Sequence, residues 1–127
     1  LGLISRALDR LRKEDSSIDK ISVIDAGGGA SFLVSTLLQQ SLASEVAILD
    51  ISQKALEFAR AREPRAQYLL ADVTTYEFQT RYHVWHDRAV FHFFTEESAR
   101  TRYLQRAAKA LIGGGRLIMG TFSLNGP

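Results

Sequence analysis

The stretch VIDAGGGASFLVSTLL, residues 23–38, decides the fold class of this 127-residue chain. It runs from a short β-branched segment that ends in Asp25, through three consecutive glycines, into a segment with apolar residues at helical spacing. Consecutive glycines are costly, because glycine gives up more backbone freedom on folding than any other residue. The stretch therefore predicts a strand, a tight turn and a helix, with another group lying close to the bare backbone of the turn.

Outward from this stretch, short apolar segments alternate with amphipathic ones along the whole chain. Short strands that are apolar throughout are typical of a parallel sheet with helices on both faces. We therefore expect a single α/β domain with a doubly wound, mainly parallel sheet. The expected strands are residues 21–25, 45–50, 67–72, 82–89 and 116–124, and the expected helices are residues 1–14, 31–42, 52–62 and 95–112. The expected N-caps are Ser31, Ser52 and Thr95, and the expected helix stops are Pro64 and Gly113–Gly115.

The composition narrows the class of protein. The chain has no cysteine, which excludes disulfides and thiolate metal sites. Its net charge is only +2, and basic residues alternate with acids, as in RALDRLRKED (6–15), so we expect a solvated surface and no nucleic-acid partner. No apolar run reaches the roughly 18 residues of a membrane span, and no signal peptide is seen. We expect a cytoplasmic protein with no membrane partner.

The two ends of the sequence suggest a longer natural protein. The first residue is Leu1, the last residues are Asn125, Gly126 and Pro127, and the predicted sheet stops after a fifth strand. We expect the domain, residues 1–127, to be incomplete at both ends. An unpaired edge strand can pair with a second chain, so a dimer through the sheet edge is one expectation, although the sequence does not establish the oligomeric state.

Carboxylates follow the first three predicted strands. Asp25 ends the first, Asp50 the second and Asp72 the third. Ligands of open α/β sheets bind beyond the carboxyl ends of the strands. Each acid alone could serve a turn or a helix cap, but three acids at one edge repel one another unless a ligand with several donors satisfies them. The pattern therefore predicts a ligand site at this edge.

Two classes of ligand use a glycine-rich turn after the first strand. The dinucleotide fingerprint reads G-x-G-x-x-G/A. Counted from Gly27, its last small residue falls on Phe32, and counted from Gly28, its second glycine falls on Ala30. Neither frame fits, which disfavours an NAD(P)-binding oxidoreductase domain.

The other class is the nucleoside of S-adenosylmethionine. In order along the chain, VIDAGGGAS, AILDIS, LLADVTTYEF and ALIGGGRLIMGTF resemble four motifs of the class I S-adenosylmethionine-dependent methyltransferases, which have a Rossmann-like fold. The sequence departs from the family pattern at Ser31 and Gly113, where glycine and proline are frequent, and at Tyr82-His83, where an aromatic residue and Asp are usual. The family's sheet normally has seven strands, so the resemblance also implies a core truncated after the fifth.

The resemblance implies S-adenosylmethionine as cofactor and assigns its contacts. The first motif would hold the methionine end, the acid of the second strand the ribose hydroxyls, and the third motif the adenine. The implied cofactor-binding residues are Asp25, Ala26, Gly27, Gly28, Gly29, Asp50, Ile51, Asp72 and Val73, together with Asp87 from the fourth strand.

The stretch VWHDRAVFHFF, residues 84–94, crowds polar groups into the fourth predicted strand and its end. Buried polar groups are expensive unless satisfied, so we predict His86 and Asp87 as catalytic residues beside the transferred methyl group, with Arg88 turned away to an ion pair. The alternative is that Trp85 and the phenylalanines are core and Asp87 pairs with a base. Alternation along a strand separates the histidines, so no metal site is expected.

The function that follows is S-adenosylmethionine-dependent methyl transfer to an unidentified acceptor, either a small molecule or a protein. Two alternatives stay open: a non-catalytic module that binds a nucleotide or S-adenosylmethionine, and an NAD(P)-binding oxidoreductase domain. The sequence does not name the acceptor.

Overall fold

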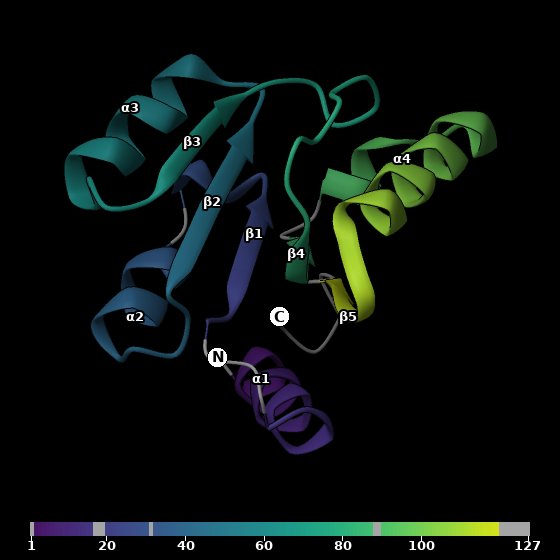
Figure 1. Cartoon of the computed structure of the whole chain (residues 1–127). Coiled ribbons are helices and arrows are strands. Elements are labelled where there is room, and N and C mark those ends of the chain that lie inside the picture. The colour runs from purple at the N-terminus through teal and green to yellow at the C-terminus, as the bar shows by residue number, and fades with distance from the viewer. Residues whose placement is uncertain (1, 17–19, 31, 88–89, 120–127) are drawn as a thin grey trace.

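The computed structural model describes residues 2–16, 20–30, 32–87 and 90–119. Its five strands form one parallel sheet in the order β3-β2-β1-β4-β5 (Figure 1). The direction of the order reverses between β1 and β4, as in a doubly wound fold. The predicted fold class is therefore confirmed. The strands are β1 (Ser22–Ala26), β2 (Glu45–Asp50), β3 (Gln67–Leu70), β4 (Tyr82–Asp87) and β5 (Leu111–Met119).

Helices cover both faces of the sheet (Figure 1). The helices α1 (Gly2–Glu14), α2 (Leu33–Gln39) and α3 (Gln53–Arg62) bury their apolar stripes in one core layer with Val23, Ile48 and Val84 of the strands. The helix α4 (Glu97–Ala110) packs in the other layer, with Ile24 and Trp85. Two 3₁₀ helices, η1 (Gly28–Ala30) and η2 (Val90–Phe93), follow β1 and β4.

The junction between α4 and β5 corrects the sequence prediction. We expected the helix to run to residue 112 and the three glycines to stop it, but it ends at Ala110 and β5 begins at Leu111. Leu111 pairs with Tyr82, and a shift in register between Tyr82 and Val84 accommodates the glycines inside the strand. Glycine tolerates such an irregularity because it can adopt positive φ, as Gly114 does at +80°.

Other boundaries move by a few residues. The N-cap of α4 is Glu96 instead of Thr95, and α2 ends at Gln39, short of residue 42, where the chain turns through Ser41 at a φ of +54°. β3 ends at Leu70, two residues earlier than expected, and the last two residues expected in β4, 88–89, lie outside the described residues. The expected cap Ser31 lies outside the described residues. The edge strands of the described sheet are β3 and β5, and pairing of either with a second copy stays a prediction.

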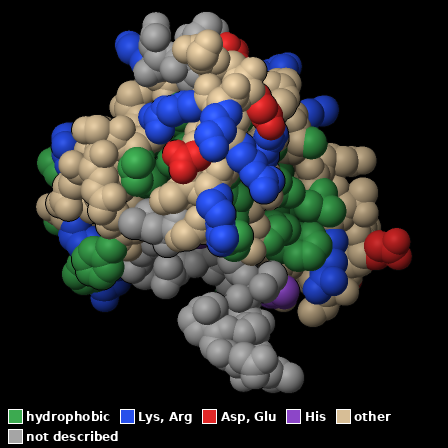
Figure 2. Space-filling view, turned by 90° about the horizontal axis from the view of Figure 1, so that it is seen from below, with side chains coloured by type: hydrophobic (Ala, Val, Ile, Leu, Met, Phe, Trp, Pro, Cys, Tyr) green, Lys and Arg blue, Asp and Glu red, His purple; other side chains and the backbone are tan. Residues whose placement is uncertain are grey.

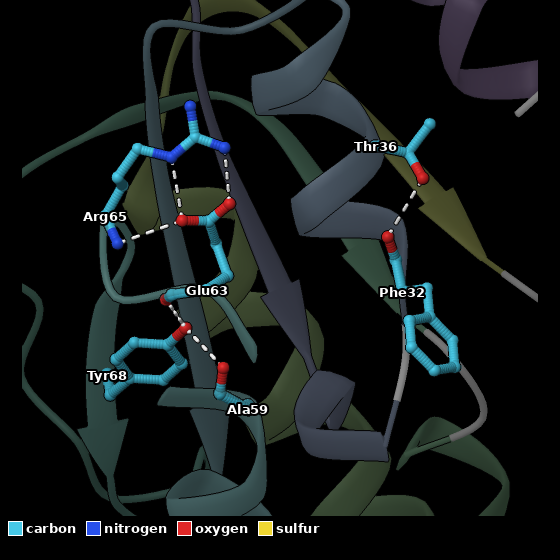
Figure 3. Close-up of polar contacts among 6 residues, drawn as sticks. All are labelled: Phe32, Thr36, Ala59, Glu63, Arg65 and Tyr68. Atoms are coloured by element: carbon cyan, nitrogen blue, oxygen red, sulfur yellow. Dashed lines mark hydrogen bonds and ion pairs between the residues drawn. The ribbon is translucent and has the colours of Figure 1, made fainter. Parts of the chain in front are cut away.

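The prediction for α3 is confirmed at both ends. Ser52 caps it, its side chain accepting a hydrogen bond from the amide of Ala55 at 3.1 Å. Beyond its last residue, the carboxylate of Glu63 accepts from Nε of Arg65 at 2.8 Å and Nη2 at 2.6 Å, and the hydroxyl of Tyr68 lies against the carbonyl of Ala59 (Figure 3). These bonds fix the return of the chain from α3 into β3, and so place the loop that follows β3.

The end of the molecule at which α1 lies carries many Lys and Arg side chains, with acids among them (Figure 2). The helix itself supplies Arg10, Arg12 and Lys13 beside Asp9 and Glu14. Arg12 donates to the carbonyl of Leu42, just before β2 begins, so this end of α1 lies at the amino edge of the sheet.

No helix within the described ranges is long and apolar enough to cross a membrane.

Candidate functional site

A cavity of about 440 Å³ opens at the carboxyl edge of the sheet, where the sequence predicted a ligand site. This volume falls within the range of small-molecule sites. Its walls come from the ends of β1, β2 and β3 and from the segment that follows β4. The lining residues are Gly27, Leu49, Asp50, Ile51, Ala71, Asp72, Val73, Val90, Phe93 and Phe94.

Asp50, the last residue of β2, ties two parts of this cavity together. Its Oδ2 accepts from the amide of Gly29 at 3.2 Å, and its Oδ1 accepts from the amide of Ser52 at 2.9 Å. The carboxylate therefore fixes the glycine turn against the start of α3. An ionised carboxylate offers about four lone pairs, so after these two bonds Asp50 still has acceptor capacity for hydroxyl groups of a ligand.

Asp72 reaches the same cavity from the loop after β3. Its Oδ1 accepts from the hydroxyl of Thr74 at 2.7 Å and from the Thr74 amide at 2.8 Å. The hydroxyl bond, followed by the amide bond, lowers the pKa of Asp72. Because Asp72 is exposed and ionised at neutral pH, the site presents two carboxylates to a ligand.

The glycine turn is shaped by the protein's own side chains. Gly27 has a φ of +74°, and a Cβ there would lie 2.3 Å from Cγ2 of Val90. A Cβ at Gly28 would lie 2.2 Å from Oδ2 of Asp25, and one at Gly29 would lie 2.6 Å from the Cβ of Ala55. Real Cβ atoms do not approach so closely, so each of the three positions excludes a side chain for a different local reason.

Arg62 holds the far end of this turn. Its Nη2 donates to the carbonyl of Gly29 at 3.0 Å, and its guanidinium lies 4.7 Å from the centre of the Phe32 ring. Phe32 is 66% exposed and precedes α2, where its carbonyl accepts from the hydroxyl of Thr36 (Figure 3). The turn is thus anchored from α3 as well as from β2.

Asp25 does not line the cavity. It is fully buried beneath the turn, and its Oδ1 lies 2.9 Å from Nδ1 of His86, its register partner in β4. Direct contact of Asp25 with a cofactor stays a prediction. In the structure its Oδ2 fills the space next to Gly28, and its Oδ1 links β1 to His86 in β4.

Asp87 faces the opposite side of β4, as strand alternation predicts. It is 1% exposed, and its carboxylate accepts from the amides of Val90 at 2.6 Å and Phe91 at 3.0 Å and from the hydroxyl of Tyr103. His86 and Asp87 therefore act on different faces of the sheet. Their catalytic roles stay predictions, and the expected ion pair of Arg88 lies outside the described residues.

The structure brings together only part of the predicted site. Gly27, Asp50, Ile51, Asp72 and Val73 line one cavity, whereas Ala26, Gly28 and Gly29 are not among its lining residues. Five further lining residues were not predicted from the sequence. Leu49 and Ala71 directly precede predicted ligand residues, and Val90, Phe93 and Phe94 belong to an apolar run after β4, a position that marks the same edge of the sheet.

Two large apolar side chains stand exposed at this cavity. Ile51 is 74% exposed and Phe93 is 82% exposed. Exposed apolar surface around a concave site is typical of a place that a ligand covers. The cavity thus combines two carboxylates with an apolar rim, a combination that suits a ligand with hydroxyl groups and a flat heterocycle.

Solved structures share this fold. CalS10, an amino pentose methyltransferase from Micromonospora echinaspora solved with S-adenosylmethionine, matches with a TM-score of 0.79 and 18% identity over 94% of this chain and 49% of its own. A TehB-like S-adenosylmethionine-dependent methyltransferase from Corynebacterium glutamicum matches with a TM-score of 0.74 and 20% identity over 97% of this chain and 64% of its own. The chain thus spans between about half and two thirds of these structures, and at such identities the likeness concerns the fold alone.

Among curated proteins, none matches the sequence. A family model described as a methyltransferase domain matches residues 23–115, from the first residues of β1 to the glycines of β5. The match covers more than half of the chain and includes the glycine turn, Asp50 and Asp72, and the chain therefore belongs to the methyltransferase-domain family.

Proposed function

We propose that the cavity binds S-adenosylmethionine and that the protein transfers its methyl group to an acceptor. The observation that carries the proposal is the meeting of Gly27, Asp50 and Asp72 at one cavity in a chain of this family. S-adenosylmethionine supplies an electrophilic methyl group on a sulfonium. The residues present fit it, because carboxylates accept from ribose hydroxyls and the apolar rim suits an adenine.

We assign the residues by their positions. Asp50 accepts hydrogen bonds from the ribose hydroxyls, and Ile51 lies beside the nucleoside. Asp72 and the backbone of Val73 contact the adenine. The turn Gly27–Gly29 with Ala26 faces the methionine end, and Asp25 acts there from beneath the turn. The contacts of Asp50 with Gly29 and Ser52 support this assignment, since they hold the carboxylate at the rim of the cavity.

His86 is the base that we propose for an acceptor whose nucleophile must lose a proton. In this proposal the carboxylate of Asp25 accepts a hydrogen bond from Nδ1 of His86, which lies 2.9 Å from its Oδ1. In the neutral ring Nε2 is then the nitrogen that can take a proton. Asp25 would orient the ring and fix its tautomer, as the acid of a catalytic triad does.

The acceptor that we favour is a small molecule. CalS10 is named for an amino pentose, and MtfA, with a TM-score of 0.68 and 17% identity, is named as a glycopeptide N-methyltransferase. These names belong to those proteins and suggest only the first acceptors to assay here. The cytoplasm stays the proposed compartment on the sequence argument.

The test is calorimetric titration with S-adenosylhomocysteine. Asp50→Ala is expected to weaken binding more than tenfold, because hydrogen bonds to a charged acceptor are worth about 1.5–3 kcal/mol. Asp9→Ala removes an exposed carboxylate of α1, at the other end of the molecule, and is the matched control. Equal affinity of a folded Asp50→Ala variant and the control would refute the assignment of Asp50.

A further inference from the structure

One wall of the cavity lies outside the sheet. Val90, Phe93 and Phe94, which line it, belong to η2 and the residue after it. We call residues 90–94 the 90–94 wall. Strand pairing does not hold this segment in place, and hydrogen bonds from Asp87 and Arg100 reach it instead.

Asp87 caps the 90–94 wall from the end of β4. Its two oxygens accept from the first two amides of η2, those of Val90 and Phe91. A carboxylate that accepts from the first amides of a helical turn satisfies donors that have no partner within the turn. This cap also directs Val90 toward Gly27, where the lack of a Cβ leaves room for Cγ2 of Val90.

Behind Asp87 stands a buried pair of aromatic residues. The hydroxyl of Tyr103 in α4 donates to Oδ2 of Asp87 and accepts from Nε1 of Trp85 at 3.0 Å. Both aromatic side chains are fully buried. Burial raises the pKa of Tyr103, and its bond to Asp87 raises it further, so the hydroxyl stays protonated and keeps donating.

The ring of Tyr103 contacts the same wall. Its centre lies 5.7 Å from that of Phe91 and 5.9 Å from that of Phe94, both in edge-on or tilted arrangements. Arg100, one turn earlier in α4, adds a bond from Nε to the carbonyl of Phe94 at 2.5 Å. Among the described contacts, α4 therefore meets the 90–94 wall through Arg100 and Tyr103, with Tyr103 bonded to Asp87 as well.

We propose that Tyr103 is a positioning residue, whose hydroxyl, held by Trp85, fixes Asp87 and through it the 90–94 wall, and so sets how tightly the cavity holds its adenosyl ligand. The proposal rests on the proposed function for the identity of that ligand. The bonds that place the wall are properties of the chain alone and can be tested without any ligand.

The test compares Tyr103→Phe with Tyr82→Phe. Both changes remove one hydroxyl from a buried tyrosine in the same core layer, but Tyr82 is not bonded to Asp87 or to the 90–94 wall among the described contacts. In Tyr103→Phe we expect amide exchange at Val90 and Phe91 to become at least about tenfold faster, since their acceptor is no longer held. We expect binding of S-adenosylhomocysteine to weaken by roughly tenfold, and Tyr82→Phe to change neither.

Trp85 gives an independent signature, because it is the chain's single tryptophan. Its one indole N–H resonance is expected to shift in Tyr103→Phe and to keep its position in Tyr82→Phe. An unshifted resonance, or equal exchange at Val90 and Phe91 in the two variants, would overturn the proposal. Should Tyr103→Phe not fold, Trp85→Phe removes the indole N–H that donates to the hydroxyl of Tyr103. It is expected to make amide exchange at Val90 and Phe91 faster, and unchanged exchange in this variant would also overturn the proposal.

The two proposals fail in different ways. If the wild-type protein does not bind S-adenosylhomocysteine, the proposed function fails, while the exchange measurement still decides whether Tyr103 positions the wall. If wild type binds and Tyr103→Phe binds equally well, the cofactor assignment stands and the positioning role of Tyr103 is wrong.

Discussion

Nδ1 of His86 lies 2.9 Å from Oδ1 of Asp25, although the two residues are 61 positions apart in the chain. They are register partners in the adjacent strands β1 and β4, at the reversal of the strand order. The pair therefore links the glycine turn above Asp25 to the strand that carries the proposed base. A change at Asp25 or His86 would therefore affect both the packing of the two strands and the proposed base.

The first prediction concerns the stability that the bond between His86 and Asp25 contributes, and it compares two substitutions of His86. His86→Ala is expected to lower the free energy of unfolding by about 1.5–3 kcal/mol, because a buried carboxylate loses a donor. His86→Asn is the matched control, since its amide nitrogen can occupy the place of Nδ1, and it should lose less than about 1 kcal/mol. Urea denaturation measures both. Equal losses in the two variants would show that the bond to Asp25 does not stabilise the fold.

The second prediction concerns the left-handed glycine of the turn. Gly27→Ala is expected to destabilise the fold by about 1–3 kcal/mol, because it forces a side chain into positive φ and against Val90. It should also weaken S-adenosylhomocysteine binding, since Gly27 lines the cavity. The matched control is Gly113→Ala, where a Cβ meets nothing within 4 Å.

Thermal unfolding and calorimetry check the second prediction. The control is expected to stay within about 0.5 kcal/mol of wild type, as is usual for surface changes away from special features. A Gly27→Ala protein with wild-type stability and affinity would mean that the turn adapts to a side chain, and that the close approach of Val90 does not require glycine at this position.

The third prediction follows from the lowered pKa of Asp72. A folded pKa below the unfolded value means that ionised Asp72 stabilises the fold above about pH 4, and that this contribution is lost as the pH falls through the folded pKa. Thr74→Val removes the hydroxyl that bonds the carboxylate. It is expected to raise the pKa of Asp72 toward its ordinary value and to reduce the loss of stability in this acid range.

NMR titration of the Asp72 carboxyl carbon measures the third prediction. Thr75→Val is the control, because the Thr75 hydroxyl donates to the main-chain carbonyl of Asp72 at 3.3 Å and not to its carboxylate. The control should leave the pKa of Asp72 unchanged. An unchanged pKa in Thr74→Val would show that the hydroxyl bond is not its main cause.

The fold could be predicted from the sequence where local signals and the sheet agree. β2 and α3 have the predicted bounds, because an apolar run, the N-cap Ser52 and the stop at Pro64 act over a few residues. The start of β5 could not be predicted in this way. Its glycines read as a helix stop, whereas the pairing of Leu111 with Tyr82, a tertiary contact, makes them part of a strand.

The carboxylates of the candidate site could be predicted from the sequence, whereas most of the apolar residues that line the cavity could not. Asp50 and Asp72 stand at strand ends, where topology alone gathers them at one edge. The roles of Asp25 and Asp87 depend on partners far away in sequence, His86 and Tyr103, which no local pattern reveals. Both acids are buried, and Asp87 bonds the amides of Val90 and Phe91 in the segment that forms one wall of the cavity.

The identity of the ligand that fills the cavity is tested most directly by a calorimetric titration of the chain with S-adenosylmethionine, S-adenosylhomocysteine, NAD and NADP. We predict saturable binding of the two adenosyl ligands with one site per chain, and no binding of either dinucleotide at the same concentrations, since the glycine turn lacks the dinucleotide fingerprint and Phe32 stands at its last small position. Binding of NAD or NADP without binding of S-adenosylhomocysteine would show that the cavity is a dinucleotide site and not an S-adenosylmethionine site.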